Sequence, residues 1–207
     1  MENNNYIASN ENIILDEDQK QIMLNRIESH FEDIFTDMKI DWENDRNMKR
    51  TPFRIAKMYV NEIFAGTYNK EPEITIFSNE RNYDQIVVSG PIAVKSMCSH
   101  HFMPFYGKAY IGYLPDKHVI GVSKLSRIVD WYARRPQIQE ELSEQIADYL
   151  MKNLKPKGII VFMKAKHQCM THRGVNDNSE MITSVVKGDF SKNNSLKTEF
   201  FNMIRGL

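Results

Sequence analysis

The chain has 207 residues, enough to bury one full hydrophobic core, so we expect one domain that can carry an N-terminal extension. Its 27 basic and 27 acidic side chains cancel, which disfavours a dedicated nucleic-acid or membrane-surface binder with a basic excess. No apolar run approaches the ~18 residues that span a bilayer, and the N-terminus lacks the basic and apolar regions of a signal peptide. We therefore expect a cytoplasmic protein with reduced thiols and with no membrane or nucleic-acid partner.

The N-terminal part of the chain has a polar segment followed by two predicted helices. Residues 1–15 are rich in Asn, which predicts a mobile tail. Apolar residues recur at helical spacing from Asp16 to about Met38. Thr51 and Pro52 suit the N-cap and first position of a second helix, and Gly66 suits its end. We therefore divide the chain into a tail, a helical region over 16–66 and a main domain over 67–207.

The middle of the chain is rich in β-branched residues and turn signals, which predicts strands. The expected strands are Ile74–Phe77, Gln85–Ser89, Ile92–Met97, Phe102–Leu114 and Val119–Val122. Gly90 and Pro91 separate the second of these strands from the third.

Helical and strand patterns then alternate to the C-terminus. Ser123 can cap a helix over Lys124–Arg134, and Pro136 can start another that reaches Leu150. The remaining expected elements are a strand over Gly158–Lys166, its hairpin partner over Met181–Lys187 and a closing helix over Leu196–Ile204. This order predicts an α+β fold, with helices on one face of an antiparallel β-sheet and further helices before it.

The two cysteines of the chain lie close in sequence to histidines. Cys98 precedes His101 by three residues, and Cys169 follows His167 by two. Two thiolates and one imidazole suit a zinc site with an open fourth position, as in metal-assisted hydrolysis. The spacing alone also allows two free buried thiols, whereas nothing in the N-terminus indicates the secretion that favours a disulfide.

Six segments together resemble the motifs of a known enzyme family. They are Thr51–Tyr59, Met97–His101, Gly121–Val129, Arg135–Glu140, His167–Cys169 and Arg173–Val175. In order and spacing they resemble the type I GTP cyclohydrolases, over about residues 17–204. The resemblance implies hydrolysis of GTP at carbon 8 of guanine to 7,8-dihydroneopterin triphosphate and formate. It also implies that residues 67–207 form a catalytic domain with the tunnelling fold, and that subunits assemble as a toroidal homodecamer.

The resemblance assigns a metal and acid–base residues. It implies that Cys98, His101 and Cys169 hold Zn²⁺ as the cofactor. Carbon 8 of guanine is a poor electrophile and needs a strong nucleophile at neutral pH. Zinc can supply one, because it lowers the pKa of a bound water to about 7. The neighbouring ring nitrogen needs a proton, which a histidine with a pKa near neutrality can supply. The resemblance makes His100 and His167 the candidates.

The resemblance also assigns a recognition site for the guanine base. A carboxylate can accept hydrogen bonds from both N1–H and the exocyclic amine of guanine, which makes Glu140 the implied anchor. Gln139 is a weaker implied partner. Without the resemblance, Glu140 is an ordinary first-turn glutamate that the helix dipole stabilises.

The triphosphate requires several cations, and pairs of basic residues recur at helical spacing. Such pairs usually belong to solvated helix faces, whereas the resemblance places them around the phosphates, with Ser123 near the sugar or phosphate. The implied cations are Lys124, Arg127, Arg173, Arg54 and Lys57.

One departure from the family pattern lies beside the metal ligands. Ser99 stands where the family usually has glutamate, which removes a negative charge and leaves the tuning of proton transfer open. Ser99 favours one alternative function, a catalytically impaired or regulatory metal-binding ring. A second alternative is a tunnelling-fold relative acting on another purine or pterin, which would not need the metal ligands or the phosphate cations.

The resemblance finally implies active sites shared between subunits, with the zinc ligands and Glu140 coming from different copies. The reaction is the first step of pterin and folate biosynthesis, or of the 7-deazaguanine route.

Overall fold

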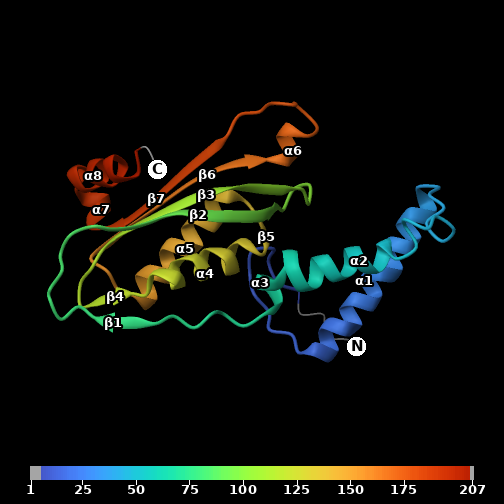
Figure 1. The fold of residues 1–207 in the computed structure, drawn as a ribbon, viewed down its shortest axis with the longest axis horizontal. Coiled ribbons are helices and arrows are strands. Elements are labelled where there is room, and N and C mark those ends of the chain that lie inside the picture. Colours follow the sequence, from blue (N-terminus) through green and yellow to red (C-terminus); the bar gives the residue numbers. More distant parts are fainter. Residues whose placement is uncertain (1–5, 206–207) are drawn as a thin grey trace. The chain divides into compact units, whose positions relative to one another are not determined.

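The computed structural model describes residues 6–205, and the chain forms two compact units, residues 1–70 and 71–207 (Figure 1). Of the predicted mobile tail, residues 1–5 lie outside the described part. Residues 12–15 are held by hydrogen bonds that the polar composition did not predict: the Asn12 amide donates to the carbonyl oxygens of Gly66, Thr67 and Asn69. The proposed division of the chain at residues 66 and 67 stays a prediction.

The first unit is helical. Its elements are α1 (Glu17–Asp37), α2 (Thr51–Met58), a π-helix (Tyr59–Ile63) and α3 (Ala65–Tyr68). Asp16 caps α1 in a capping box with Gln19, which confirms the predicted start of this helix. Stacked aromatic rings of Phe31, Tyr59 and Phe64 form part of the packing, with centroids 6.2 Å and 5.3 Å apart along the series.

Two predicted helix signals in this unit are wrong. The N-cap of α2 is Arg50, and Thr51 is the first helical residue; its hydroxyl accepts a hydrogen bond from the Arg54 guanidinium instead of capping the helix. Gly66 does not end the helix, because helical structure continues past it through α3, where Gly66 is buried.

The second unit is built on a five-stranded sheet in the order β5-β2-β3-β6-β7. Its strands are β2 (Val87–Cys98), β3 (Pro104–Leu114), β5 (Pro136–Gln137), β6 (Gly158–His167) and β7 (Met181–Gly188). Neighbours are antiparallel except for the short parallel pair of β5 with β2. A separate antiparallel pair joins β1 (Ile76–Ser78) to β4 (His118–Ile120).

The two predicted strands around Gly90 and Pro91 form one long strand, β2. The chain stays paired with β3, and the register shifts between Ser89 and Ile92. A Cβ atom added at Gly90 would lie 2.5 Å from the ring of Tyr110, so the close approach of β3 explains the glycine.

Two long helices cover one face of the sheet, as predicted. They are α4 (Val122–Ala133) and α5 (Gln139–Asn153). Side chains such as Leu125, Leu142 and Ile111 form the main core between these helices and the strands. The boundaries differ from the prediction: Gly121 rather than Ser123 is the N-cap of α4, and α5 begins after β5 rather than at Pro136.

The prediction that all helices of this unit lie on one face is wrong for the C-terminal helices. Phe190 of α7 (Asp189–Lys192) and Phe200 of α8 (Asn194–Ile204) pack in a second core with Tyr110 and Ile160. Because side chains alternate along a strand, Tyr110 and Ile160 point away from the face that α4 and α5 cover. Their apolar side chains require a cover of their own.

No helix within residues 6–205 has both the length and the apolar character that crossing a membrane requires.

Candidate functional site

The Cys98–His101 segment forms the turn between β2 and β3. Cys98 is the last residue of β2 and is buried. Its N–H donates to the Met103 carbonyl, and its own carbonyl accepts from the N–H of Phe102, both at 2.9 Å. These bonds close the turn, and His100 and His101 are exposed on it.

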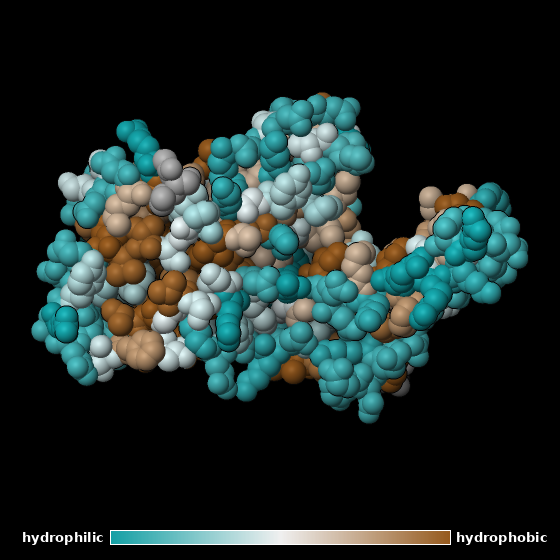
Figure 2. All heavy atoms as spheres, viewed as in Figure 1, coloured by the Kyte–Doolittle hydropathy of each residue, from teal (hydrophilic) through white to brown (hydrophobic). Residues whose placement is uncertain are grey.

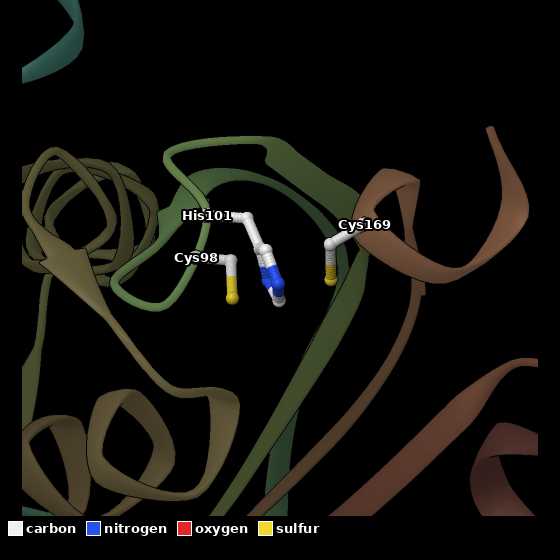
Figure 3. Close-up of side chains that lie close together, drawn as sticks. All are labelled: Cys98, His101 and Cys169. Atoms are coloured by element: carbon white, nitrogen blue, oxygen red, sulfur yellow. The ribbon is translucent and has the colours of Figure 1, made fainter. Parts of the chain in front are cut away.

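Cys169 reaches the same end of the sheet from β6. It lies in the one-turn helix α6 (Gln168–Thr171), which starts directly after His167, the last residue of β6. The pairing of β3 with β6 places His167 opposite Phe105, just after the β2–β3 turn. The sulfur atoms of Cys98 and Cys169 and a ring nitrogen of His101 all lie within 4.8 Å of one another (Figure 3). The fold therefore joins the three residues that the sequence assigned to a metal, and both cysteines are free.

This donor set fits a zinc ion. Zn–S bonds of about 2.3 Å and Zn–N bonds of about 2.0 Å require donor atoms roughly 4 Å apart. The donor atoms here lie within 4.8 Å of one another, which is compatible with that spacing. The pKa of the Cys169 thiol is raised by burial and by the neighbouring Cys98 thiol, while Arg173 opposes the shift. A divalent cation between the two sulfurs would remove this penalty on their ionisation. Three protein ligands leave a fourth position open, which is typical of catalytic rather than structural zinc.

His167 is buried beside this group, and other side chains contact both the face and the edge of its imidazole ring. Its ring stacks on Phe105, with centroids 4.6 Å apart and planes at 7°. Its Nε2 lies 2.9 Å from Oε1 of Gln139. Burial lowers the pKa of His167, and the carboxylate of Glu140 opposes that shift. The burial of this imidazole thus favours its neutral form, next to a carboxylate.

The two adjacent residues predicted to bind guanine differ sharply in exposure. Glu140 is exposed in the first turn of α5 and can meet a ligand. Gln139 is fully buried, and its amide bonds to His167 and to groups of β6 and β7. No group of the Gln139 side chain faces solvent, and its predicted contact with the base stays a prediction.

The two remaining predicted site residues near the metal group, His100 and Arg173, are exposed. His100 is next to His101, with ring centroids 6.5 Å apart and the rings edge to face. Arg173 follows α6 and is close enough to lower the pKa of Cys169. Ser99 is half-buried, and its N–H donates to the Gln137 carbonyl at 3.3 Å. Sequence reasoning did not identify Phe105, because its contact with His167 depends on the pairing of β3 with β6.

The predicted phosphate ligands of α4 belong to the half of the helix that is farther from the cysteine group within one chain. Ser123, Lys124 and Arg127 lie in the first half of α4, which begins just after β4. The end of α4 leads into β5, which pairs with Met97 and Cys98. A helix of 12 residues rises about 18 Å, so its first turn is far from the cysteine group. Figure 1 shows β4 and α6 toward opposite ends of the sheet.

Arg54 and Lys57 belong to the N-terminal unit, on α2. The Arg54 guanidinium donates to the Asn47 carbonyl and the Thr51 hydroxyl, each at 2.8 Å. Their predicted phosphate contacts stay predictions.

Comparisons with known proteins show the family of this chain. The sequence model of the family "GTP cyclohydrolase I" matches residues 27–205. A GTP cyclohydrolase 1 of Pelotomaculum thermopropionicum is 46% identical over 164 residues, which cover 77% of this chain and 85% of the relative. Proteins of the same name from Wigglesworthia glossinidia brevipalpis and Aliivibrio fischeri are 40% and 39% identical. These alignments cover 86% and 94% of this chain, and 82% and 88% of the relatives.

Proposed function

Because this chain belongs to the GTP cyclohydrolase I family, we propose that it hydrolyses GTP at carbon 8 of guanine. The products are 7,8-dihydroneopterin triphosphate and formate. The observation that carries this proposal is the grouping of Cys98, His101 and Cys169 beside a buried His167. The grouping places a metal-binding set next to an acid–base residue, which is the chemistry that this activity needs.

Cys98, His101 and Cys169 are the proposed ligands of Zn²⁺. When bound, the ion supplies a Lewis acid and lowers the pKa of a water to about 7, which provides a nucleophile at neutral pH. Two thiolates and one neutral imidazole are ligands that zinc prefers over hard cations such as Mg²⁺.

His167 and His100 are the proposed proton carriers. Ring opening needs a proton at the nitrogen next to carbon 8. A neutral imidazole near the substrate can accept a proton from the attacking water, and the imidazolium so formed can deliver it to that nitrogen. His167 is held rigidly by Phe105 and Gln139, whereas His100 is exposed on a turn. We therefore assign the main acid–base role to His167.

Glu140 is the proposed anchor for guanine. Its carboxylate is exposed in the first turn of α5 and influences His167, so a bound base there would lie near the metal group. The carboxylate can accept from N1–H and the exocyclic amine together, which excludes adenine, because adenine offers no such pair of donors.

The triphosphate is proposed to bind Arg173 together with Ser123, Lys124 and Arg127 of a second copy. This sharing is supported by the distance of the start of α4 from the cysteine end within one chain. This arrangement differs from the one expected from the sequence, in which Glu140 and the zinc ligands come from different subunits. Burial lowers the pKa of His167 and Glu140 of the same chain opposes that shift, so Glu140 need not come from another subunit. Arg54 and Lys57 of α2 remain further proposed phosphate ligands.

A toroidal homodecamer is the proposed assembly. Within the described residues, β7 pairs with β6 and leaves an open edge that another copy can continue. Figure 2 shows hydrophobic residues gathered on the visible surface at the end of the second unit that carries α8 and β4. Large exposed apolar side chains on these elements and their neighbours are Phe77, Tyr83, Val122, Phe201 and Met203. Such surfaces are typical of protein–protein contacts.

The reaction is proposed to open pterin and folate biosynthesis, or the 7-deazaguanine route, in the cytoplasm. The test is incubation of the zinc-loaded protein with GTP, followed by measurement of formate and of a fluorescent pterin after oxidation. Formation of both, and neither with Cys169→Ser, supports the proposal. A zinc-loaded wild-type protein that forms neither product would point to the impaired or regulatory ring instead.

A further inference from the structure

The Gln139 amide is fixed in one orientation by the strands that it contacts. Its side chain is fully buried, at 0% exposure. The amide nitrogen lies 3.3 Å and 3.2 Å from the carbonyl oxygens of Met163 and Met181, and 3.1 Å from the Thr183 hydroxyl. Carbonyl oxygens only accept hydrogen bonds, so the NH₂ group must face them. A flipped amide would place its oxygen against two carbonyl oxygens in a buried site.

This orientation determines which nitrogen of His167 carries a hydrogen. The Gln139 Oε1 atom lies 2.9 Å from Nε2 of His167. Because an amide oxygen only accepts, Nε2 must donate and therefore carries the hydrogen. A neutral imidazole has one N–H, so the lone pair of the His167 ring lies on Nδ1.

Phe105 restricts the same ring from its face. The two rings are nearly parallel, at 7°, with centroids 4.6 Å apart. A hydrogen bond at one edge and a stacked ring on one face together leave the imidazole little freedom to rotate. The position of Nδ1 is thus defined by residues that do not themselves carry protons.

We propose that Gln139 is a positioning residue that holds His167 as the Nε2–H tautomer, which makes Nδ1 the nitrogen that exchanges a proton with the substrate. Its catalytic consequence rests on the proposed hydrolysis of GTP. The inference replaces guanine binding as the task of Gln139 and leaves that task to the exposed Glu140. Two adjacent residues at the start of α5 then have different roles: Gln139 orients the acid–base residue His167, and Glu140 binds guanine.

The tautomer can be observed directly. Zinc-loaded protein labelled with ¹⁵N in histidine is studied by magic-angle-spinning NMR, at a pH at which the His167 ring is neutral. The signals of His167 are assigned by their loss in His167→Gln. We expect a protonated Nε2 and an unprotonated Nδ1 in the wild type. In Gln139→Ala the acceptor is lost, so the Nδ1–H form should appear.

A matched variant separates orientation of the ring from general damage to the buried cluster. Thr183→Val removes one partner of the Gln139 amide but leaves both carbonyl acceptors and His167 untouched. We expect it to keep the Nε2–H tautomer. Zinc content and circular dichroism of each variant show whether the site and the fold persist.

Kinetics distinguish positioning from substrate binding. Loss of a residue that orients a catalytic side chain typically reduces activity by about 10- to 100-fold. Gln139→Ala should therefore lower kcat by roughly that factor and change KM for GTP little. A direct contact with guanine would instead raise KM while kcat stayed near the wild-type value.

Two results would overturn the inference: an Nδ1–H tautomer in the wild type, or an unchanged tautomer in a folded Gln139→Ala. If Gln139→Ala fails to fold, the wild-type spectrum still decides between the tautomers. The NMR measurement needs no turnover, so a wild type that forms no formate refutes the proposed function and leaves the tautomer assignment to be judged on its own spectrum.

Discussion

Phe105 and His167 lie opposite each other on β3 and β6, and their rings stack with planes at 7°. Phe105 is fully buried, so its ring is a fixed surface under the imidazole. Phe105→Leu keeps most of the volume and should cost only about 1–1.5 kcal/mol of stability. Because the imidazole would gain freedom, kcat should fall by about 10- to 100-fold. Phe162→Leu, on the opposite face of β6, is the control and should retain kcat. Equal kinetic effects of the two substitutions would argue against a role for the stack.

Removal of the metal should stop the reaction without unfolding the protein. Cys169→Ser loses one soft ligand of three, so we expect a zinc content well below one ion per subunit and no ring opening. The main core lies between the sheet and α4 and α5, so the thermal transition should shift little. Elemental analysis, formate release and calorimetry check these outcomes, with Met170→Leu as the control. A metal-free preparation with full activity would contradict the metal assignment.

Glu140→Ala should impair recognition of GTP strongly. The guanine N1–H and amine would lose their acceptor, which typically costs about 2–5 kcal/mol for a buried charged contact. The cost should show in kcat/KM for GTP, measured against Glu141→Ala in the same helical turn. Unchanged kinetics in Glu140→Ala would return this residue to the role of an ordinary first-turn glutamate.

Active sites shared between copies can be tested by mixing two inactive variants. Arg127→Ala keeps the metal ligands but loses a phosphate ligand of α4. Cys169→Ser keeps the α4 cations but loses a metal ligand. Each variant should therefore be inactive alone. Unfolding the two together, mixing them equally and reassembling them should restore activity in about a quarter of the sites, because each working site needs one intact half from each variant. No recovery in properly reassembled mixtures, or an active monomer in sedimentation, would count decisively against shared sites.

Lys187 joins β7 to α5 through two ion pairs. Its ammonium lies 2.6 Å from carboxylate oxygens of Glu144 and of Asp148. Burial lowers the pKa of Lys187, but the hydrogen bonds to Asp148 and Glu144 outweigh it, and the net pKa is raised above the ordinary 10.5. The stabilisation is therefore fully present below pH 10.5 and is lost as the pH rises through the raised value.

Both carboxylates are largely exposed, so screening keeps the effect small. Lys187→Gln should lower the free energy of unfolding by at most about 1 kcal/mol at neutral pH, and less in high salt. Lys192→Gln on α7 is the control. Chemical denaturation at low and high salt measures the difference, and a salt-independent loss would indicate that packing rather than charge is responsible.

The sequence by itself determined which residue types are available for the site and where most helices and strands of the chain lie. Ligand types are a property of residue identity, so Cys98, His101 and Cys169 could be named before any fold was known. Long amphipathic patterns, such as α1 with its capping box, could also be predicted, because capping and periodicity are local. The six motifs added the family and the reaction.

Only the tertiary structure decided how these residues act together. The stacking of Phe105 on His167 and the burial of Gln139 follow from strand pairing, which brings together residues that local patterns do not relate. The position of α8 also depends on tertiary packing. This helix covers the second apolar face of the sheet, and that face forms only when several strands are paired side by side. Pairing and packing are non-local, and they make Gln139 a buried partner of His167, a contact that the sequence did not predict.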